Sequence, residues 1–207
     1  IDQLKILSKS HVNTTGVSAV AVDPNSGAIL AMVSWPDYDP NNFSRGITEK
    51  EWNAIVQNPD HPMQNRVISS MYPPGSTFKV VTGAAGLEDK VITPNERIFD
   101  SGRHWLIDKR NASGEAFGWV NFYDAVAKSD NVYFYEVGRR LGIDKISAMA
   151  RAFGLGKKTG IDLPNETSGL IRNLESPRNI EYANASFGQG IALTPVEAVR
   201  AFSILAN

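Results

Sequence analysis

The stretch between Val67 and Leu87 contains one charged side chain, Lys79. A Met-Tyr-Pro-Pro-Gly segment comes before Ser76, and the residues around and after Lys79 are mostly small or apolar. A proline-rich turn followed by such residues predicts a helix from Ser76 to about Asp89 that is buried on most of its sides. The pattern therefore places a single amine inside the protein.

Ser76 lies in the first turn of this predicted helix, and Lys79 follows three residues later on the same face. Burial disfavours the ammonium form and lowers the pKa of a lysine. A neutral Lys79 could then take the proton of the Ser76 hydroxyl and make it a nucleophile. A serine followed three places later by a lysine occurs by chance roughly once in a chain of this size, so the pair alone is a weak signal.

A second polar group, Ser129-Asp130-Asn131, interrupts two short helical patterns at 122–128 and 132–141. A specified tripeptide is expected on the order of a few times per hundred chains of this length. Serine, aspartate and asparagine also favour helix caps, so a simple capping turn between two helices is the alternative. Its position downstream of Ser76 and Lys79 favours a functional role.

Together the two motifs resemble those of the penicillin-recognising serine transpeptidases, whose marks are Ser-x-x-Lys, Ser-x-Asn and Lys-Thr-Gly. The similarity is greatest to the class B penicillin-binding proteins of the elongation-type penicillin-binding protein 2 group, and it extends over nearly all of the chain from about Gly16. The stretches that carry it are residues 16–24, 34–36, 38–43, 72–79, 154–164, 188–190 and 193–195.

The third mark of that family has no clear counterpart. Lys158-Thr159-Gly160 is present, but it lies in a glycine-rich segment without a strand pattern, so we interpret it as a structural loop. In the family the functional copy lies on an edge strand that follows a Gly-Gln-Gly turn and its helix. We therefore expect residues 1–207 to be a partial transpeptidase domain, truncated before that strand, with the amino-terminal anchor and pedestal and the carboxyl-terminal strands absent.

Periodicity predicts strands at 17–22 and 28–33 joined by a hairpin turn, and helices at 122–128, 132–141 and 143–153. Capping boxes at Thr48 to Glu51 and Thr194 to Glu197 predict two further helix starts, and residues 93–118 read as a long loop with small strands. Strands followed by helices, without β-α-β alternation, predict an α+β fold. The resemblance implies the penicillin-binding transpeptidase and serine β-lactamase-like fold, an antiparallel sheet with a helical subdomain.

Composition excludes several kinds of function. The chain has 207 residues, of which 42% are hydrophobic, which suffices for the core of one domain. A formal net charge of −1 gives no field that would attract nucleic acid, and the lack of cysteine excludes thiol catalysis and thiolate metal sites. No apolar run approaches the length of a membrane span.

We also expect no metal or other cofactor. Asp100, His104 and Asp108 are spaced four apart and could share a helical face, but Gly102 and the polar surroundings indicate a loop. No glycine-rich phosphate-binding loop of the P-loop or dinucleotide type is present.

The resemblance implies a serine-type D,D-transpeptidase. Ser76 would attack a peptidoglycan stem peptide ending in D-Ala-D-Ala with Lys79 as its base, and β-lactam antibiotics would acylate the same hydroxyl. Ser129 would relay a proton to the leaving nitrogen and Asn131 would bind the backbone of the substrate. Asp130 is the other candidate for substrate binding, although we expect it to order the loop. The family also implies a membrane anchor, the extracytoplasmic face of the bacterial membrane and a membrane glycosyltransferase partner.

Two alternatives stay open. A serine β-lactamase shares both motifs but must hydrolyse its acyl-enzyme, which class A enzymes do with a glutamate acting through water. Glu166 is the candidate, but it lies in a Leu-Pro-Asn-Glu turn and we expect it to face solvent. The other alternative is a non-catalytic fragment of the penicillin-binding fold that lacks the Lys-Thr-Gly strand.

Overall fold

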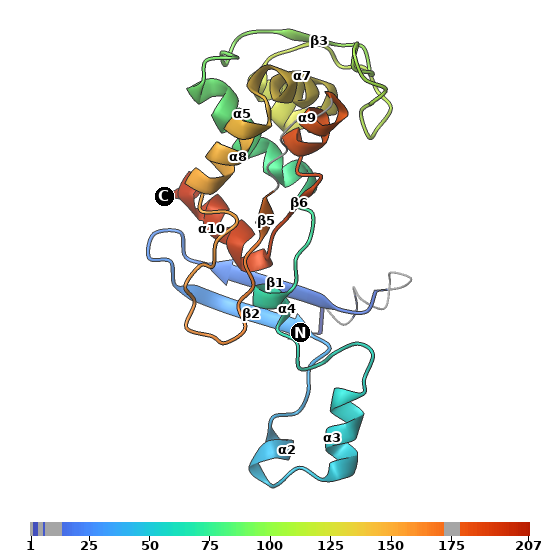
Figure 1. Ribbon diagram of the computed structural model, residues 1–207, viewed down its shortest axis with the longest axis vertical. Helices are drawn as coiled ribbons and strands as arrows, with labels where there is room; N and C mark the ends of the chain where they lie inside the picture. The colour runs from blue at the N-terminus through green and yellow to red at the C-terminus, as the bar shows by residue number, and fades with distance from the viewer. Residues whose placement is uncertain (1, 4–5, 7–13, 172–178) are drawn as a thin grey trace. The chain divides into compact units, whose positions relative to one another are not determined.

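The computed structural model describes residues 2–3, 6, 14–171 and 179–207 (Figure 1). The chain divides into two compact units. The first comprises residues 1–71, 158–168 and 194–207, and the second comprises residues 72–157 and 169–193. Each unit is built from segments that are distant in the sequence.

The first unit is organised around an antiparallel hairpin of β1 (Val17–Val22) and β2 (Ile29–Trp35). Its turn is closed by Asp23, whose carboxylate accepts hydrogen bonds from the Ser26 hydroxyl at 2.5 Å and the Asn25 N–H at 3.0 Å. Gly27 completes the turn with a φ of +74°. The predicted hairpin is confirmed, with the second strand starting and ending later than expected.

Two helices pack on this hairpin, α4 (Arg66–Ser69) and α10 (Pro195–Ala206). Their shared core contains the following buried and half-buried side chains: Val67, Ile68, Val196, Val20, Met32 and Ile161. The predicted capping box at the start of α10 is present, with both Thr194 and Glu197 making their reciprocal bonds.

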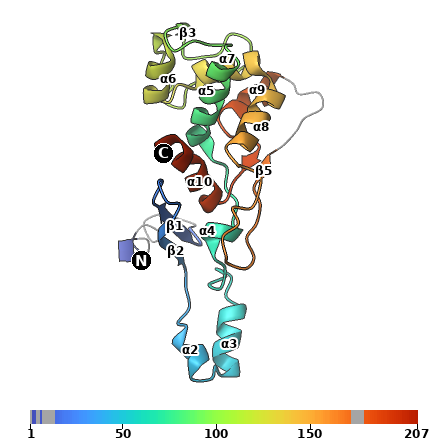
Figure 2. The ribbon, with the colours of Figure 1, turned by 90° about the vertical axis from the view of Figure 1, so that its left-hand side faces the viewer.

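A second predicted capping box, Thr48 with Glu51, starts α3 (Glu49–Val56). Figure 2 shows α3 beside α2 (Asn41–Ser44). The ring of Phe43 lies edge-on to Tyr38 and Trp52, at centroid distances of 5.4 and 6.4 Å. These contacts hold the two short helices together.

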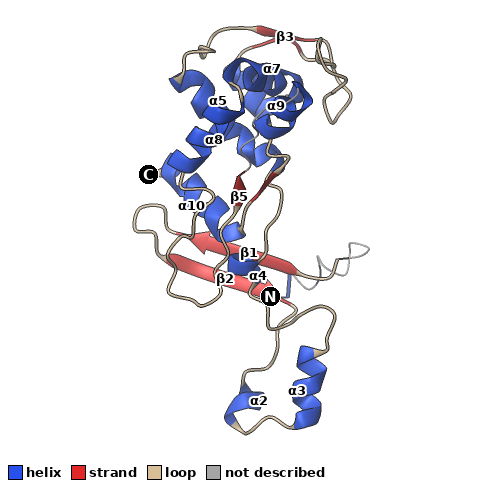
Figure 3. Cartoon of the chain, in the orientation of Figure 1, coloured by secondary structure: helices blue, strands red, loops and turns tan. Residues whose placement is uncertain are grey.

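The second unit is mainly helical (Figure 3). Its helices are α5 (Lys79–Glu88), α6 (Phe122–Lys128), α7 (Asn131–Leu141), α8 (Ile143–Ala152) and α9 (Asn179–Ser186). Two small antiparallel pairs accompany them: β3 (Ile98–Asp100) with β4 (Gly118–Val120), and β5 (Leu170–Ile171) with β6 (Ile191–Ala192). The predicted helices and the small strands at 93–118 are confirmed, with helix ends shifted by single residues.

Helix α7 is the centre of this unit because it packs against α5, α8 and α9. Its residues Tyr133, Phe134 and Val137 are fully buried. Gly138 lets α9 approach closely, since a Cβ there would lie 2.6 Å from that of Ser186. The residues at the start of α7 are thereby fixed on a rigid element.

The helix predicted from Ser76 begins differently from expectation. Residues Gly75–Phe78 form the 3₁₀ helix η1, and α-helical geometry starts only at Lys79. Gly75 adopts a φ of +57° directly after two prolines, which turns the chain sharply into η1. A tight 3₁₀ turn at the start of an α-helix is a frequent arrangement.

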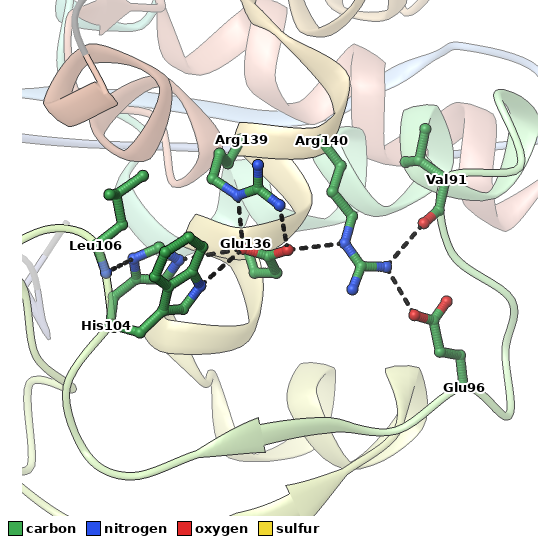
Figure 4. A network of polar contacts seen from close by, with 8 residues as sticks. Val91, Glu96, His104, Leu106, Glu136, Arg139 and Arg140 are labelled. Atoms are coloured by element: carbon green, nitrogen blue, oxygen red, sulfur yellow. Dashed lines mark hydrogen bonds and ion pairs between the residues drawn. The ribbon is translucent and has the colours of Figure 1, made fainter.

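A buried carboxylate on α7, that of Glu136, organises a polar network (Figure 4). It accepts two hydrogen bonds of 2.8 Å from Arg139 and one of 2.9 Å from Arg140. Arg140 extends the network to the Glu96 carboxylate at 2.7 Å and the Val91 carbonyl at 3.0 Å. The network therefore ties α7 to the segment that follows α5.

The same carboxylate ties α7 to the long loop after β3. His104 Nε2 lies 3.3 Å from Glu136 Oε2, and the Trp105 indole N–H lies 3.4 Å from it. Burial raises the pKa of Glu136, but the hydrogen bonds from Arg139, His104 and Arg140 outweigh burial and hold the pKa below its ordinary value of 4.5. The ionised carboxylate consequently stabilises the folded state.

We expect Glu136→Gln to lower the free energy of unfolding at pH 7 by about 3 kcal/mol, because it leaves two guanidinium groups without their buried partner. A carboxyl group whose pKa is lower in the folded state contributes its stability above the unfolded pKa, and this stability is lost as the pH falls. In urea unfolding, the difference in the free energy of unfolding between wild type and variant should therefore decrease as the pH falls below about 5. Glu96→Gln, at the half-buried outer end of the network, should lower the free energy of unfolding by about 1 kcal/mol or less. A constant gap down to pH 2 would contradict this account.

Candidate active site

The segment that carries Ser76 is held in place by the Gly-Gln-Gly turn. A Cβ at Gly188 would lie 2.8 Å from the Pro74 ring and 2.9 Å from Phe78 Cβ, so only glycine permits this approach. Ser76 itself is exposed in η1, while Lys79 is 3% exposed at the start of α5. The hydroxyl is thus open to a substrate and the amine is inside.

The Lys79 amine binds Ser129 and Asn131, the first and last residues of the second motif. Its Nζ donates to the Ser129 carbonyl at 2.6 Å, to Asn131 Oδ1 at 2.6 Å and to Ser129 Oγ at 3.1 Å. Ser129 makes this possible by adopting a left-handed conformation, with φ +54°, between α6 and α7. The structure therefore brings together three of the predicted site residues, which lie some fifty positions apart in the chain.

Burial lowers the pKa of Lys79 to about 8, and the charge of Asp130 opposes part of this shift. At pH 7 the neutral form then makes up about one tenth of the molecules, against less than one in a thousand for an ordinary lysine. The predicted lowering of the lysine pKa is confirmed in direction and in cause. A neutral amine is available near physiological pH.

The contact between Ser76 and Lys79 is less direct than the sequence suggested. Among the described residues, the hydrogen bonds of the amine go to Ser129 and Asn131, and none joins it to the Ser76 hydroxyl. The hydroxyl to which the amine is hydrogen-bonded is that of Ser129, with Oγ at 3.1 Å from Nζ. Catalytic hydrogen bonds are often long in structures without substrate and tighten when it binds.

Asp130 is fully buried and acts as the N-cap of α7. Its Oδ1 accepts from the Tyr133 N–H at 2.9 Å. Burial is the main cause that raises the pKa of this carboxyl to about 6. Its burial and its bond to the Tyr133 N–H favour the expectation that Asp130 orders the turn between α6 and α7 over a contact with substrate.

Sequence reasoning missed Asn111, which belongs to the long loop after β3. Its Oδ1 accepts from the Asn131 N–H at 2.8 Å and the Val132 N–H at 3.2 Å. Neither motif nor periodicity distinguishes an asparagine in a polar loop, so no sequence signal identified it. It contacts the site through the backbone of the second motif.

The three residues considered as metal ligands serve separate purposes. Asp100 accepts from Asn111, Gly102 and Phe117. His104 contacts Glu136, and Asp108 forms an exposed ion pair of 2.9 Å with Arg103. Within the described ranges, no cluster of three such residues is arranged to hold a metal ion.

Lys158-Thr159-Gly160 forms a loop, as predicted, but the expectation that Glu166 faces solvent is wrong. Glu166 is 8% exposed rather than facing solvent. Its carboxylate accepts from the Thr159 N–H and hydroxyl, each at 2.6 Å, and from the Gly160 N–H at 3.2 Å. The left-handed residue before it, Asn165 with φ +65°, turns the chain so that the carboxylate reaches back to the loop.

Comparison with known proteins identifies the fold and the family. A profile of the penicillin binding protein transpeptidase domain matches residues 17–207. The chain belongs to this transpeptidase family. The expected α+β fold of that family is confirmed, with small antiparallel sheets and many helices.

The transpeptidase chain has relatives across bacteria. It is 34% identical to the peptidoglycan D,D-transpeptidase MrdA of Acinetobacter baumannii over 99% of its own length. Penicillin-binding protein 2 of Helicobacter pylori, in its complex with MreC, superposes on 98% of the chain with a TM-score of 0.87 and 30% identity. Penicillin-binding protein A of Mycobacterium tuberculosis, as a penicillin G acyl-enzyme, superposes on 92% with a TM-score of 0.82 and 34% identity.

These matches cover only part of each relative. The chain spans 32% of the A. baumannii protein, 40% of the H. pylori chain and 46% of the M. tuberculosis chain. The resemblance to the penicillin-binding protein 2 group is confirmed by these relatives. Within the part of the transpeptidase chain that the structure describes, no helix is long and apolar enough to cross a membrane.

We expect Glu166→Ala to lower the free energy of unfolding of the transpeptidase chain by about 1–3 kcal/mol, because three donors in the 159–160 loop lose their acceptor. Because the carboxylate is occupied by these donors, the variant should leave the rate of β-lactam hydrolysis unchanged. Thermal unfolding and nitrocefin turnover measure the two effects, and Glu115→Ala, at an exposed loop position, is the matched control. Unchanged stability together with slower nitrocefin turnover would instead indicate a hydrolytic role for Glu166.

Proposed function

We propose that the protein is a peptidoglycan D,D-transpeptidase that cross-links stem peptides through an acyl-enzyme on Ser76. The observation that carries this proposal is the buried Lys79 amine, bound to Ser129 and Asn131 in a chain of the transpeptidase family. The curated relatives of A. baumannii and Escherichia coli are named peptidoglycan D,D-transpeptidases. Ser76, Lys79, Ser129 and Asn131 form the proposed catalytic and substrate-binding set.

In the first step, the Ser76 hydroxyl attacks the carbonyl carbon of the penultimate D-alanine in a stem peptide ending in D-Ala-D-Ala. The neutral Lys79 amine takes the hydroxyl proton, directly or through Ser129 Oγ. The negative charge that develops on the carbonyl oxygen is stabilised by backbone N–H groups at the start of the helix, which have no acceptor within it. The Ser76 N–H is the donor nearest to the nucleophile.

In the second step, the tetrahedral intermediate collapses and D-alanine leaves. Ser129 Oγ, which is 3.1 Å from Lys79 Nζ, relays the proton from the amine to the leaving nitrogen. The side-chain amide of Asn131 holds the peptide backbone of the substrate. The amine of a second stem peptide then attacks the acyl-enzyme, which forms the cross-link and frees Ser76.

The location and the partners of the protein follow from the same proposal. A transpeptidase acting on peptidoglycan works at the extracytoplasmic face of the bacterial membrane. We propose that residues 1–207 are part of one transpeptidase domain in a protein anchored by an amino-terminal helix. We propose further that it works with a membrane glycosyltransferase; the H. pylori relative was solved in complex with MreC, and another relative within a peptidoglycan synthase complex.

One observation supports an alternative for the chain taken alone. The Lys158-Thr159-Gly160 tripeptide lies in a loop whose donors are bound by Glu166, so it does not provide a strand for substrate pairing. A non-catalytic module of the penicillin-binding fold is therefore the second candidate.

We expect penicillin G to form one covalent adduct per molecule, because its strained amide imitates the terminal D-Ala-D-Ala bond. Intact mass spectrometry should show this adduct in the wild type and in the control Ser44→Ala, which changes an exposed serine of α2. Ser76→Ala should show none. An adduct that persists in Ser76→Ala would contradict the proposed nucleophile, and a folded wild type without an adduct would select the non-catalytic alternative.

We expect the rate of acylation by penicillin G to rise with pH and to level off above a midpoint near pH 8, because burial lowers the pKa of Lys79 to about 8 and the neutral amine is the base. Lys79→Arg keeps the positive charge but cannot lose its proton, so it should lower the rate by about 100-fold or more. Stopped-flow measurement between pH 6 and pH 10 tests both expectations. A flat profile, or an active arginine variant, would contradict the assignment of Lys79 as the base.

A further inference from the structure

We propose that Asp100 and Asn111 are positioning residues for the transpeptidase reaction. They form a buried two-residue support that fixes the backbone of Asn131 and thereby aims Asn131 and Ser129 at Lys79. This inference rests on the proposed function, and it assigns a role to two residues that lie outside the sequence motifs of the family.

The first step of this support is the contact between Asn111 and the start of α7. Asn111 is 6% exposed, and its Oδ1 accepts from the N–H groups of Asn131 at 2.8 Å and Val132 at 3.2 Å. These are first-turn N–H groups, which have no acceptor within the helix. The side chain of Asp130 satisfies the next one, that of Tyr133. Two side chains distant in sequence thus cap one helix end.

Fixing the Asn131 N–H also fixes the direction in which the Asn131 side chain leaves the backbone. That side chain has its Oδ1 at 2.6 Å from Lys79 Nζ and its Nδ2 at 3.3 Å from the Arg110 carbonyl. Arg110 directly precedes Asn111, so the same loop holds the second-motif asparagine by its backbone and by its side chain. A displacement of this loop would move an acceptor of the buried amine.

The second part of this support is Asp100, which fixes the orientation of the Asn111 side-chain amide. Asp100 is fully buried, and its Oδ2 accepts from Asn111 Nδ2 at 2.6 Å. The same Nδ2 donates to the Glu115 carbonyl at 2.9 Å. An asparagine amide flipped by 180° would turn its NH₂ group toward the N–H groups of α7 and its oxygen toward a carboxylate. The carboxylate therefore selects the orientation in which Asn111 can cap α7.

A buried charge at position 100 lowers the stability of the fold unless it is well hydrogen-bonded. Asp100 meets that condition through Asn111 Nδ2, the Gly102 N–H at 2.6 Å and the Phe117 N–H at 3.1 Å. Its carboxylate thus joins both ends of the 101–117 loop to the side chain that holds the second motif. A hydrophobic residue could close the loop, but it could not orient Asn111.

Exchange of the two side chains provides the test. Asn111→Asp places two carboxylates against each other. Asp100→Asn has one acceptor oxygen in place of two, so its NH₂ group faces either Asn111 Nδ2 or the Gly102 N–H. The double variant restores one donor and one acceptor between positions 100 and 111, and the carboxylate at position 111 still accepts from the α7 N–H groups, while the Glu115 carbonyl loses its donor. Asn95→Asp, at an exposed position of the same unit, is the control for added charge.

We expect each single variant to lower the rate constant of acylation by penicillin G by about 10- to 100-fold in the folded fraction, because small displacements of catalytic groups have effects of that size. The affinity of the preceding non-covalent complex should change little. The double variant should recover part of the loss that Asn111→Asp causes. The proposal would be overturned if the folded single variants kept the wild-type rate constant, or if the double variant were no faster than Asn111→Asp. A purely structural role would lower the stability of the variants without changing the rate constant of the folded fraction.

Hydrogen exchange of the Asn131 and Val132 amides provides a readout that does not depend on catalysis. Both amides should exchange at least about 10-fold faster in Asp100→Asn than in the wild type, and protection should return in the double variant. Unchanged protection would overturn the proposed support. If the wild type forms no acyl-enzyme while the exchange pattern is as expected, the proposed function fails and the support is retained.

Discussion

The burial of one lysine amine is the constraint on which the site depends. An ammonium group in the interior is unfavourable unless its protons are bound. Lys79 meets this requirement with two acceptors at 2.6 Å and one at 3.1 Å, all supplied by Ser129 and Asn131. Asp130 is the carboxylate whose charge raises the pKa of the amine, and it is itself buried and caps α7. Burial nevertheless lowers the pKa of the amine to about 8, against the opposing charge of Asp130, and this leaves its proton available near neutral pH.

The surrounding structure keeps these acceptors in place. Ser129 lies in a left-handed conformation between α6 and α7. Asn131 is the first residue of α7, which packs against α5, α8 and α9. The side chain of Asn111, twenty residues away in the sequence, holds the backbone of that helix start. The polar network around Glu136 anchors the same helix five residues after its first residue. The position of the acceptors is thus determined by contacts that are remote in sequence.

Local signals in the sequence predicted local structure well. The capping boxes of α3 and α10 and the limits of α6 follow from side chains within three or four residues of one another, which is the range over which caps and periodicity act. The burial of Lys79 was also predictable, since the residues around it are mostly small or apolar. The 3₁₀ start at Gly75 and the positions of Asn111 and Glu166 were not, because each depends on neighbours that only the tertiary structure supplies.

Glu166 also shows why a tripeptide alone does not define a catalytic motif. The donors of Thr159 and Gly160 are occupied by its carboxylate, so the Lys-Thr-Gly sequence here performs a structural task. At Lys79, by contrast, a buried amine lies on the helix that follows directly after the exposed Ser76. In this chain, the burial and the hydrogen bonds of a residue indicate its function better than its match to a sequence motif does.

The protonation of Lys79 in solution tests the central claim most directly. The protein can be labelled with ¹³Cε-lysine, and the Lys79 signal assigned by its loss in Lys79→Arg and followed from pH 5 to pH 11. The account predicts a titration midpoint at about 8, well below the ordinary value of 10.5. A midpoint near 10.5 would show that the amine keeps its proton at physiological pH, and it would contradict the role of Lys79 as the base.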